Sequence, residues 1–378
     1  MAAILFVMKY PLHRKENLRA KFDGQMAAMR ALGQEVYTIG WDREGMWLVG
    51  NGVRELLHRS PWTGLPGYDH TLIFGDLMMA VRQTLKKRRI DVVYLRYMPT
   101  FSSAVKTVKL LKKQGGRLVI EFPTYPREQE NKRSLLRRPV FAYTDFVLRR
   151  IHSMVDLYTV IGKDCGGVLD GRPAINIVNG IFVDNLPQHI PCPQEKAIHM
   201  LALASMAGWH GYDRMIRALA AYSGEEMICL HMVGGDGDGS LGEWQALAAE
   251  LGLGEKVVFH GALYGNDLEA VVAQSDVGIG SLGMFRFGFA SGMTLKIREF
   301  MARGLPFVYA VDDPSLPEDA RFCLRVENSE APIDMAQIVA FAKAAKADEV
   351  LPAQMRAYAR EHMSWESAMG SVLERLNL

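Results

Sequence analysis

Short runs of apolar residues alternate along the chain with longer segments in which apolar residues recur every three or four positions. A continuous apolar run of roughly four to eight residues is typical of a strand buried on both faces, whereas the longer spacing is typical of an amphipathic helix. Parallel strands need a crossover connection, usually a helix, so regular alternation of the two patterns indicates parallel sheets covered by helices. The sequence therefore predicts an α/β fold.

The first half of the chain shows the alternation most clearly. After the first apolar run, Leu18, Phe22, Met26 and Met29 lie at spacings that place them on one face of a helix. The predicted strands of this half are 3–8, 35–40, 91–96, 117–122, 156–161 and 175–178.

The second half repeats the pattern. Helices are predicted to begin near residues 212 and 241 and to span 292–303. This restart indicates a second Rossmann-like, doubly wound domain. Two such domains facing each other across a cleft would bind ligands at the carboxyl ends of their sheets. The predicted strands of this half are 199–204, 227–235, 256–261, 276–281 and 305–311.

The segment NGIFVDNLPQHIPCP, which begins at Asn179, is typical of a linker. We therefore predict an N-terminal domain over residues 1–185 and a second domain over residues 186–358. The remaining residues, 359–378, are predicted to form a C-terminal helix that could pack back towards the first domain.

The formal net charge of +2 conceals opposite charges on the two predicted domains. Residues 1–185 contain 29 Lys and Arg against 17 Asp and Glu, a net charge of +12, and residues 186–378 contain 15 against 25, a net charge of −10. The basic segments are either solvated helix faces or a surface that docks on anionic lipid, where each Lys or Arg contributes about 1 kcal/mol. No nucleic-acid-binding motif accompanies them. They are 82–90, 106–117 and 127–139.

Other features exclude whole classes of protein. No apolar run reaches the roughly 18–20 residues that a membrane-spanning helix needs, and the N-terminal sequence lacks the pattern of an export signal. The four cysteines, Cys165, Cys192, Cys229 and Cys323, form no CxxC pair and have no zinc-type histidine spacing. We therefore expect a cytoplasmic protein without disulfides or a bound metal.

Two glycine-containing loops are candidate ligand sites. The first, VGGDGDGS at 233–240, lies between a predicted strand and a predicted helix. It does not match the dinucleotide fingerprint, because its two aspartates would repel a pyrophosphate. We interpret it as a tight turn whose glycines, including Gly234 and Gly235, would let a ligand approach the backbone closely.

The second loop, at 280–294, opens directly into the predicted helix that contains Lys296 and Glu299. The first N–H groups of a helix have no intrahelical partner and carry a partial positive charge, so they could hold phosphate or sugar oxygens together with Lys296. Glu299, one turn further on, could accept hydrogen bonds from the vicinal hydroxyls of a ribose. The alternative is a helix with an ordinary surface Lys and Glu. The residues that contribute the amides are Gly292, Met293, Thr294 and Leu295.

This stretch resembles the retaining glycosyltransferases of the family 4 type, which have the two-domain glycosyltransferase B fold. KIREFMARGLPFV at 296–308 is similar to the family's E-A-M-A-x-G-x-P-[VF] helix and strand, with Glu299 at the second Glu of its E-x7-E motif. The pattern S-x-x-x-x-K-x-R-E, which begins at Ser291, is similar to that of a subgroup acting on bacterial surface polysaccharides. Three further segments resemble the family, at 175–186, 209–219 and 250–263.

The resemblance implies roles for the matching residues. Glu299 would bind the ribose of a nucleotide-sugar donor, the backbone of 292–295 would meet the diphosphate and the sugar, and Lys296 and His210 would stabilise the leaving diphosphate. His210 stands where the family has a phosphate-binding Lys, and Ser291 stands where it has the first Glu of its motif. The segment that would contact the base contains Phe259, His260 and Gly261.

In the first, acceptor-side domain the resemblance gives fewer candidates, because the His that many family members place after the 117–122 strand is absent. The turn after this strand and the polar loop after the first strand could contact phosphate, sugar or acceptor. The turn could equally serve packing alone, and the loop could be solvated. The candidate residues are Thr124, Tyr125 and Glu128 in the turn and Lys15 and Asn17 in the loop.

The predicted function is sugar transfer, with retention at the anomeric carbon, from a UDP- or GDP-sugar to a saccharide or lipid-linked saccharide in cell-surface polysaccharide synthesis. The expected enzyme needs no metal or other cofactor and works in the cytoplasm, with peripheral contact to the inner face of the anionic membrane. A sugar-nucleotide 2-epimerase of the same fold and a non-catalytic nucleotide-sugar-binding module are the alternatives.

Overall fold

The structure is a computed structural model, and it describes residues 1–12, 17–63, 65, 67–68, 72–99, 102–125, 138–191 and 197–378. The chain forms two compact units. The first comprises Met1–Gly180 together with Trp365–Leu378, and the second comprises Ile181–Ser364. The predicted boundary at residue 185 lies a few residues beyond the end of the first segment, and the last helix belongs to the first unit.

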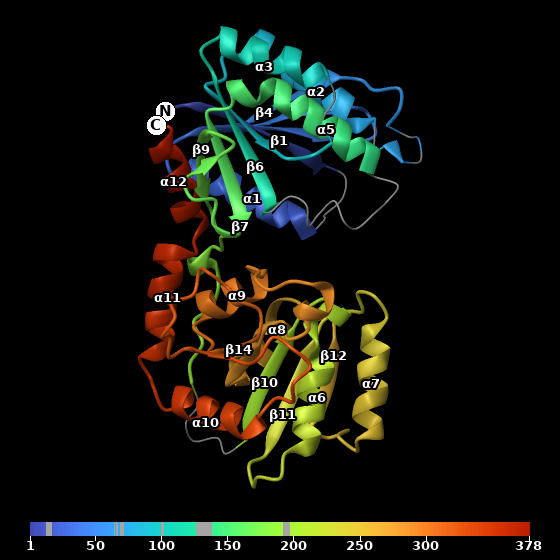
Figure 1. Cartoon of the computed structure of the whole chain (residues 1–378), viewed down its shortest axis with the longest axis vertical. Coiled ribbons are helices and arrows are strands. Elements are labelled where there is room, and N and C mark those ends of the chain that lie inside the picture. Colours follow the sequence, from blue (N-terminus) through green and yellow to red (C-terminus); the bar gives the residue numbers. More distant parts are fainter. Residues whose placement is uncertain are drawn as a thin grey trace. The chain divides into compact units, whose positions relative to one another are not determined.

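The first unit is built on a largely parallel sheet (Figure 1). Leu5, Phe6 and Val7 in its central strand are fully buried, which explains why this run is apolar throughout instead of alternating. In the described residues the strands lie side by side in the order β4 (Val53–His58), β3 (Met46–Gly50), β2 (Glu35–Trp41), β1 (Ala3–Pro11), β5 (Val92–Arg96), β6 (Arg117–Tyr125), β7 (Leu157–Gly162), β9 (Arg172–Asn176) and β8 (Val168–Leu169).

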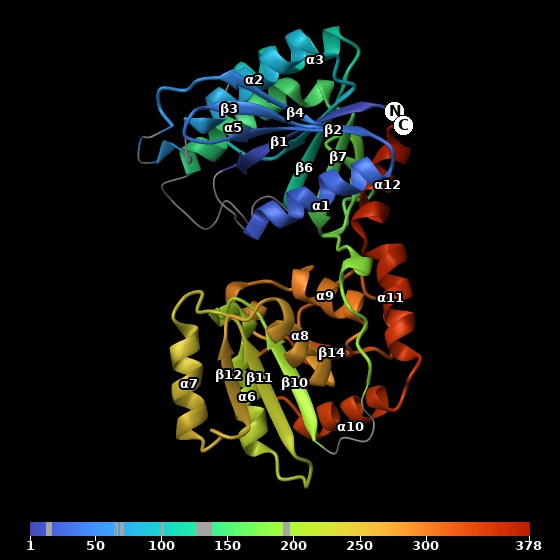
Figure 2. The same cartoon turned by 180° about the vertical axis from the view of Figure 1, so that it is seen from behind.

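Helices cover both faces of this sheet (Figures 1 and 2). One face carries α2 (Ile73–Lys87), α3 (Ser103–Lys113) and α5 (Arg138–Ile151), and the other carries α1 (Asn17–Ala31) and α12 (Trp365–Arg375). The contact between α1 and α12 is close: a Cβ added at Gly24 would lie 2.3 Å from the indole nitrogen of Trp365. The last residues of the chain are therefore part of the first unit's layered structure.

The hairpin of β3 and β4 is the main departure from the predicted strands. Both strands pair antiparallel at the edge of the sheet, and their residues are mostly half-buried, so their apolar pattern is weaker than that of the central strands. The turn between them is Asn51-Gly52, with φ of 48° and 74°. An Asn-Gly pair between two apolar runs is a strong hairpin signal, and it could have revealed this element.

The second unit contains a sheet in which all neighbouring strands are parallel. Its buried residues include Met200, Leu201 and Ala202, consecutive positions of a central strand that is covered on both faces. In the described residues the strand order is β12 (Val257–Gly261), β11 (Ile228–Val233), β10 (Ile198–Leu203), β13 (Val277–Ile279), β14 (Phe307–Tyr309) and β15 (Cys323–Arg325).

Two hydrophobic cores flank this second sheet. The first joins Met200 to helices α6 (Tyr212–Ala221), α7 (Ser240–Glu250) and α10 (Met335–Lys346). The second joins Leu201 to α8 (Gly265–Gln274), α9 (Leu295–Arg303) and α11 (Leu351–His362). Both units are thus doubly wound α/β domains, which confirms the predicted fold class. Among the described residues, no helix has both the length and the apolar character needed to cross a membrane.

Candidate functional site

Polar side chains gather at the carboxyl edge of the second sheet, the edge where parallel sheets bind ligands. His210 ends the 3-10 turn Gly208–His210 that follows β10, and Lys296 lies in the first turn of α9. Nζ of Lys296 is 2.8 Å from Nδ1 of His210 and 2.7 Å from the hydroxyl oxygen of Tyr212, the first residue of α6. The fold therefore brings together the two residues predicted to stabilise a diphosphate.

The hydrogen bonds of His210 define which ring nitrogen carries its proton. Nε2 lies 3.1 Å from the carbonyl oxygen of Ser205, which can only accept, so Nε2 is the donor. Nδ1 then accepts from Lys296, and the hydroxyl oxygen of Ser281 lies 3.1 Å from the same nitrogen. His210 is therefore a neutral ring that orients the Lys296 amine, and not a second cation.

Burial shifts the pKa of both members of this pair. Burial, reinforced by the nearby Lys296, lowers the pKa of His210 to about 2. Burial likewise lowers the pKa of Lys296 well below its usual value. The hydrogen-bond partners of Nζ, His210 and Tyr212, bring no negative charge. A bound phosphate would favour the charged amine, because an opposite charge nearby offsets the cost of burial.

The first turn of α9 lacks the usual side-chain cap. Thr294 occupies the N-cap position with φ of −88° and ψ of 143°, but its hydroxyl makes no capping hydrogen bond. Its buried Oγ1 has no partner among the residues that the structure describes. The capping residue therefore does not engage the amides of this turn, and amides at a helix N-terminus are donors suited to an anion.

The loop that leads into α9 is held against the end of β14. Ser291 forms a parallel bridge with Asp312, and the amide of Gly292 donates to the carbonyl oxygen of Asp312 at 2.8 Å. Met293 is half-buried and Leu295 is exposed, on either side of the N-cap residue. The stretch predicted at 291–295 is thus a loop that is hydrogen-bonded to Asp312 and leads directly into the first turn of α9.

Glu299 lies one turn along α9 from Lys296 and is held by a buried arginine. Nε of Arg303 donates to Oε1 of Glu299 at 3.0 Å, and its two terminal nitrogens donate to Glu269 at 2.7 and 2.8 Å. Although burial opposes the charge, the two carboxylates raise the pKa of Arg303. The side chain of Glu299 is 28% exposed, so its fixed carboxylate can still reach a ligand.

A buried ion pair ties α9 to the segment after β14. Arg298 is fully buried and donates through two nitrogens to Asp313 at 3.0 and 3.2 Å. The same carboxylate accepts from the amide of Ser315 at 3.1 Å and from its hydroxyl at 2.5 Å. These contacts fix the direction of the helix that carries Lys296 and Glu299.

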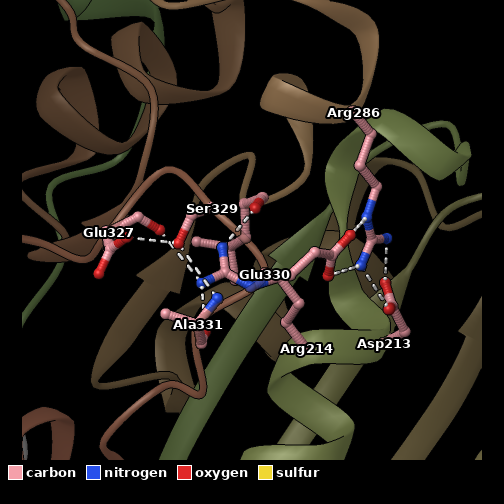
Figure 3. Close-up of polar contacts among 8 residues, drawn as sticks. Asp213, Arg214, Arg286, Glu327, Ser329, Glu330 and Ala331 are labelled. Atoms are coloured by element: carbon pink, nitrogen blue, oxygen red, sulfur yellow. Dashed lines mark hydrogen bonds and ion pairs between the residues drawn. The ribbon is translucent and has the colours of Figure 1, made fainter.

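A second network fixes the 3-10 turn Met284–Phe287, which precedes the α9 loop (Figure 3). Arg286 pairs with Asp213 at the start of α6 through two contacts of 2.9 Å, and with Glu330 at 2.6 and 2.8 Å. These carboxylates raise the pKa of the Arg286 guanidinium. Arg214 beside it donates to the carbonyl oxygens of Leu282, Glu327 and Ala331.

The predicted glycines meet at the carboxyl ends of β10, β11 and β12. Gly234 has φ of 142°, and a Cβ there would lie 1.6 Å from the carbonyl oxygen of Ala204, so only glycine fits. Its amide donates to the carbonyl oxygen of Gly261 at 2.7 Å, and the carbonyl oxygen of Gly235 accepts from the amide of Met206 at 2.8 Å. The glycine-rich segment is thus a tight connection between strand and helix.

The other two residues expected to contact a base lie next to each other in β12. Phe259 packs against the hydrophobic core on the α6 face of the sheet. His260 points to the opposite face, where its Nε2 lies 3.0 Å from Nδ1 of His231. Only one of the two side chains can therefore face a base bound on a given side of this strand.

The acceptor-side candidates are less well defined. Lys15 and Glu128 lie outside the described residues. Asn17 is the first residue of α1, and Thr124 lies near the end of β6. Tyr125 ends β6 and packs against the hydrophobic core of the first unit. Whether these residues form one site therefore stays a prediction.

A buried cluster at the carboxyl end of the first sheet was not predicted from the sequence. Glu121 in β6 is fully buried and contacts Arg96 at 2.8 Å, Lys21 at 3.4 Å, Gln25 at 2.6 Å and Tyr94 at 2.7 Å. Although burial opposes ionisation, Lys21 and Arg96 lower its pKa to about 2. The one available signal was a charged residue inside the apolar run of a buried strand.

A comparison with protein families gave a match within the second unit. Residues 197–341 match the family model described as Glycosyl transferases group 1. The matched region contains His210, Lys296 and Glu299 and lies within the second unit. A search of curated proteins gave no match.

Solved structures with a similar fold cover nearly the whole chain. Sucrose-phosphate synthase from Thermosynechococcus elongatus is 15% identical, with a TM-score of 0.67 and coverage of 100% of this chain and 99% of that chain. HepE from Anabaena in complex with UDP is 15% identical, with a TM-score of 0.63 and 99% coverage of both chains. The lipopolysaccharide outer core galactosyltransferase WaaB is 13% identical, with a TM-score of 0.61 and 99% coverage of both chains. These likenesses establish the glycosyltransferase B fold with two Rossmann-like domains.

Proposed function

We propose that this chain is a retaining glycosyltransferase of the family 4 type that takes its sugar from a UDP- or GDP-sugar. The observation that carries the proposal is the position of Lys296 and Glu299, one turn apart at the start of α9, where the N-cap side chain makes no cap. Both residues lie in the region that matches glycosyl transferases group 1. HepE, a structure of similar fold, holds UDP, which supports a nucleotide as the donor's leaving group.

The start of α9 suits the diphosphate of the donor. Its first-turn amides have no capping side chain, and the positive end of the helix dipole favours an anion there. When the diphosphate binds, Lys296 adds a cation that its neutral partners His210 and Tyr212 hold in position. Fixed donors and a fixed cation can stabilise the charge that develops on a leaving diphosphate. We therefore propose that transfer needs no divalent metal or other cofactor.

Glu299 suits the ribose of the same donor. A carboxylate accepts through both oxygens, so it can take hydrogen bonds from two adjacent hydroxyls. Arg303 engages Oε1 at 3.0 Å and thereby limits the rotation of the side chain. In this proposal Lys296 binds the phosphates and Glu299 binds the sugar of the nucleotide one turn away.

Retention is proposed to follow a front-face path. The leaving phosphate takes the proton of the acceptor hydroxyl while the new glycosidic bond forms on the same face, so the protein supplies no nucleophile. Lys296 and the helix amides stabilise the negative charge that remains on the diphosphate. His210 acts as a positioning residue, because it contacts the Lys296 amine and is itself uncharged.

The acceptor is proposed to be a saccharide, free or lipid-linked, in cell-surface polysaccharide synthesis. The likeness to WaaB, a lipopolysaccharide outer core galactosyltransferase, supports this class of acceptor. The segment 1–185, with its net charge of +12, is the part suited to an anionic surface. We propose that it makes peripheral contact with the inner face of the cell membrane, in the cytoplasm.

Helix α5 supplies the residues for that contact. It exposes the apolar side chains Val140, Tyr143 and Phe146 beside the exposed Arg149 and Arg150. The guanidinium of Arg150 lies 4.7 Å from the ring centre of Phe146. Apolar and basic side chains together on the exposed side of a helix are typical of helices that lie in a membrane interface.

Product analysis of the intact chain tests the proposed reaction. The chain is incubated with a panel of UDP- and GDP-sugars and with saccharide or lipid-linked acceptors, and the products are analysed by NMR. We expect one donor to give a glycoside with the anomeric configuration of that donor. Release of an epimerised sugar nucleotide without an acceptor would identify a 2-epimerase. Nucleotide binding without turnover of any donor would overturn the proposed enzyme in favour of a binding module.

A further inference from the structure

Three potential metal ligands lie on one face of the second sheet, and none of them is a residue predicted to bind the donor. His199 in β10 and Cys229 in β11 are register partners in a parallel strand pair, and His231 lies two residues after Cys229. Side chains two positions apart on a strand point to the same face, and register partners are neighbours, so the three side chains converge. The sulfur of Cys229 and one ring nitrogen from each histidine all lie within 4.8 Å of one another.

The two histidines already meet at nearly the separation of two ligands of one ion. Nδ1 of His199 is 2.9 Å from Nε2 of His231. In a tetrahedral site with Zn–N bonds of about 2.0–2.1 Å, two nitrogen ligands are roughly 3.3 Å apart. A small rotation of the rings would therefore let an ion replace the proton that the two nitrogens share.

We propose that His199, Cys229 and His231 bind a zinc ion, with its fourth position open to water. Imidazole nitrogen and thiolate are ligands that Zn²⁺ prefers, whereas Mg²⁺ and Ca²⁺ prefer oxygen. On binding, the thiol of Cys229 releases its proton to solvent. Each imidazole keeps its single proton on the nitrogen that faces away from the ion.

His260 in β12 completes the arrangement as the hydrogen-bond partner of a ligand. Its Nε2 lies 3.0 Å from Nδ1 of His231, the nitrogen that does not face His199. With the ion on Nε2, Nδ1 of His231 carries the proton and donates it to His260. A metal-bound histidine almost always donates its other N–H in this way, which fixes the ring and strengthens the ligand.

Two of the three ligands lie at the opposite edge of the sheet from Lys296 and His210. His199 and Cys229 each occupy the second position of their strands, near the amino edge of the sheet, whereas Lys296 and His210 lie at its carboxyl edge. His231 is buried, and His199 and Cys229 are half-buried, so the ion would keep one open side. Such an ion would cross-link β10 to β11.

Metal titration of the intact chain tests the site. Protein without an affinity tag is reduced, freed of metal with a chelator and titrated with Zn²⁺ against a chromophoric zinc chelator. We expect a single tight Zn²⁺ per chain and, with Co²⁺ in its place, a thiolate-to-cobalt charge-transfer band. Mg²⁺ should not compete. A wild-type chain that gives no thiolate-to-cobalt band would overturn the proposal.

Two cysteine variants and one histidine variant locate the ion. Cys229→Ser should lose the thiolate-to-cobalt band and weaken zinc affinity by more than roughly 100-fold. Loss of a residue that only hydrogen-bonds to a metal ligand weakens affinity by about 10- to 100-fold, and loss of a ligand itself should weaken it more. Cys323→Ser, at another half-buried cysteine of the same unit, should keep the band and the affinity. His260→Asn should still bind one Zn²⁺ per chain, with an affinity about 10- to 100-fold weaker. This variant tests the site if Cys229→Ser fails to fold. Unchanged zinc affinity in folded Cys229→Ser, or in His260→Asn, would count against the site.

Discussion

The Lys296 amine and the His210 ring, which are 86 positions apart in the sequence, form a 2.8 Å hydrogen bond at the carboxyl edge of the second sheet. The ring accepts, because its other nitrogen donates to the carbonyl oxygen of Ser205. Lys296 is thus oriented by a neutral partner while burial lowers its pKa. A diphosphate bound here would supply the opposite charge that the present partners of the amine lack.

Removing the Lys296 amine should nearly abolish sugar transfer. We expect Lys296→Ala to lower kcat/KM for the donor by about 10²- to 10³-fold, the usual cost of losing one group that stabilises developing negative charge. Lys343→Ala is the matched control, because Lys343 pairs with Glu226 on the surface of the same unit. Initial rates with the preferred donor compare the variants. Wild-type turnover by Lys296→Ala would remove this residue from the donor site.

Glu299 should matter for nucleosides but not for phosphate alone. We expect Glu299→Gln to weaken binding of UDP or GDP by roughly 10- to 100-fold, the range for a hydrogen bond to a charged group, and to leave pyrophosphate binding unchanged. Isothermal titration measures both ligands. The control is Glu269→Gln, which removes the other carboxylate on Arg303. An equal loss in both variants would mean that Glu299 acts only by holding Arg303.

Nucleotide binding should take up a proton. Burial lowers the pKa of Lys296 in the free protein, and a bound diphosphate should raise that pKa again. At a pH between the pKa of the free protein and that of the complex, the amine therefore gains a proton when the nucleotide binds. UDP or GDP affinity should therefore fall as the pH rises through that window. Titrations in two buffers of different ionisation enthalpy measure the uptake. Lys296→Arg stays protonated throughout and should bind without it. The same uptake in Lys296→Arg would assign the proton to another group.

Contact with anionic lipid should depend on the apolar residues of α5. We expect Tyr143→Ser together with Phe146→Ser to weaken binding to anionic vesicles, with the remaining affinity falling as salt rises. Neutralising Lys87 should have a smaller effect, because its amine already pairs with Glu55 at 2.6 Å. Vesicle sedimentation measures the binding. Tyr264→Ser, at a 79% exposed aromatic residue of the second unit, should change nothing. An equal loss of vesicle binding in that control would indicate non-specific adsorption through exposed aromatic residues.

Removing one partner of the buried ion pair between Arg298 and Asp313 should strongly destabilise the fold. Asp313→Ala leaves the fully buried guanidinium of Arg298 without its carboxylate, and we expect a loss of about 3–5 kcal/mol in the free energy of unfolding. Urea denaturation measures it. Asp348→Ala, which breaks an exposed pair with Arg321, should cost no more than about 1 kcal/mol. Similar costs for the two variants would show that the buried pair does not anchor α9.

Much of the fold could be predicted because parallel strands buried on both faces appear as apolar runs. The run at 3–8 became β1, and the run at 199–204 became β10, shifted by one residue. The edges of the first sheet were less visible. The half-buried hairpin strands mix polar and apolar residues, and β8 is only two residues long, so neither gives a clear period.

The candidate site was predictable only where it is local in sequence. Lys296 and Glu299 follow a loop into a helix, and this order alone indicates an anion site. The contact of Lys296 with His210 depends instead on β10 and β13 being neighbours, which no local pattern reports. The meeting of His199 with Cys229 depends in the same way on the register of β10 and β11.

The return of α12 to the first unit sets an order for folding during synthesis. The indole of Trp365 packs against Gly24 and Gly180. Trp365 nevertheless leaves the ribosome only after the entire second unit has been made. The second unit can therefore reach its complete fold while the first, although translated earlier, still lacks a helix. A nascent chain halted just before Trp365 would contain a complete second unit and a first unit that still lacks α12.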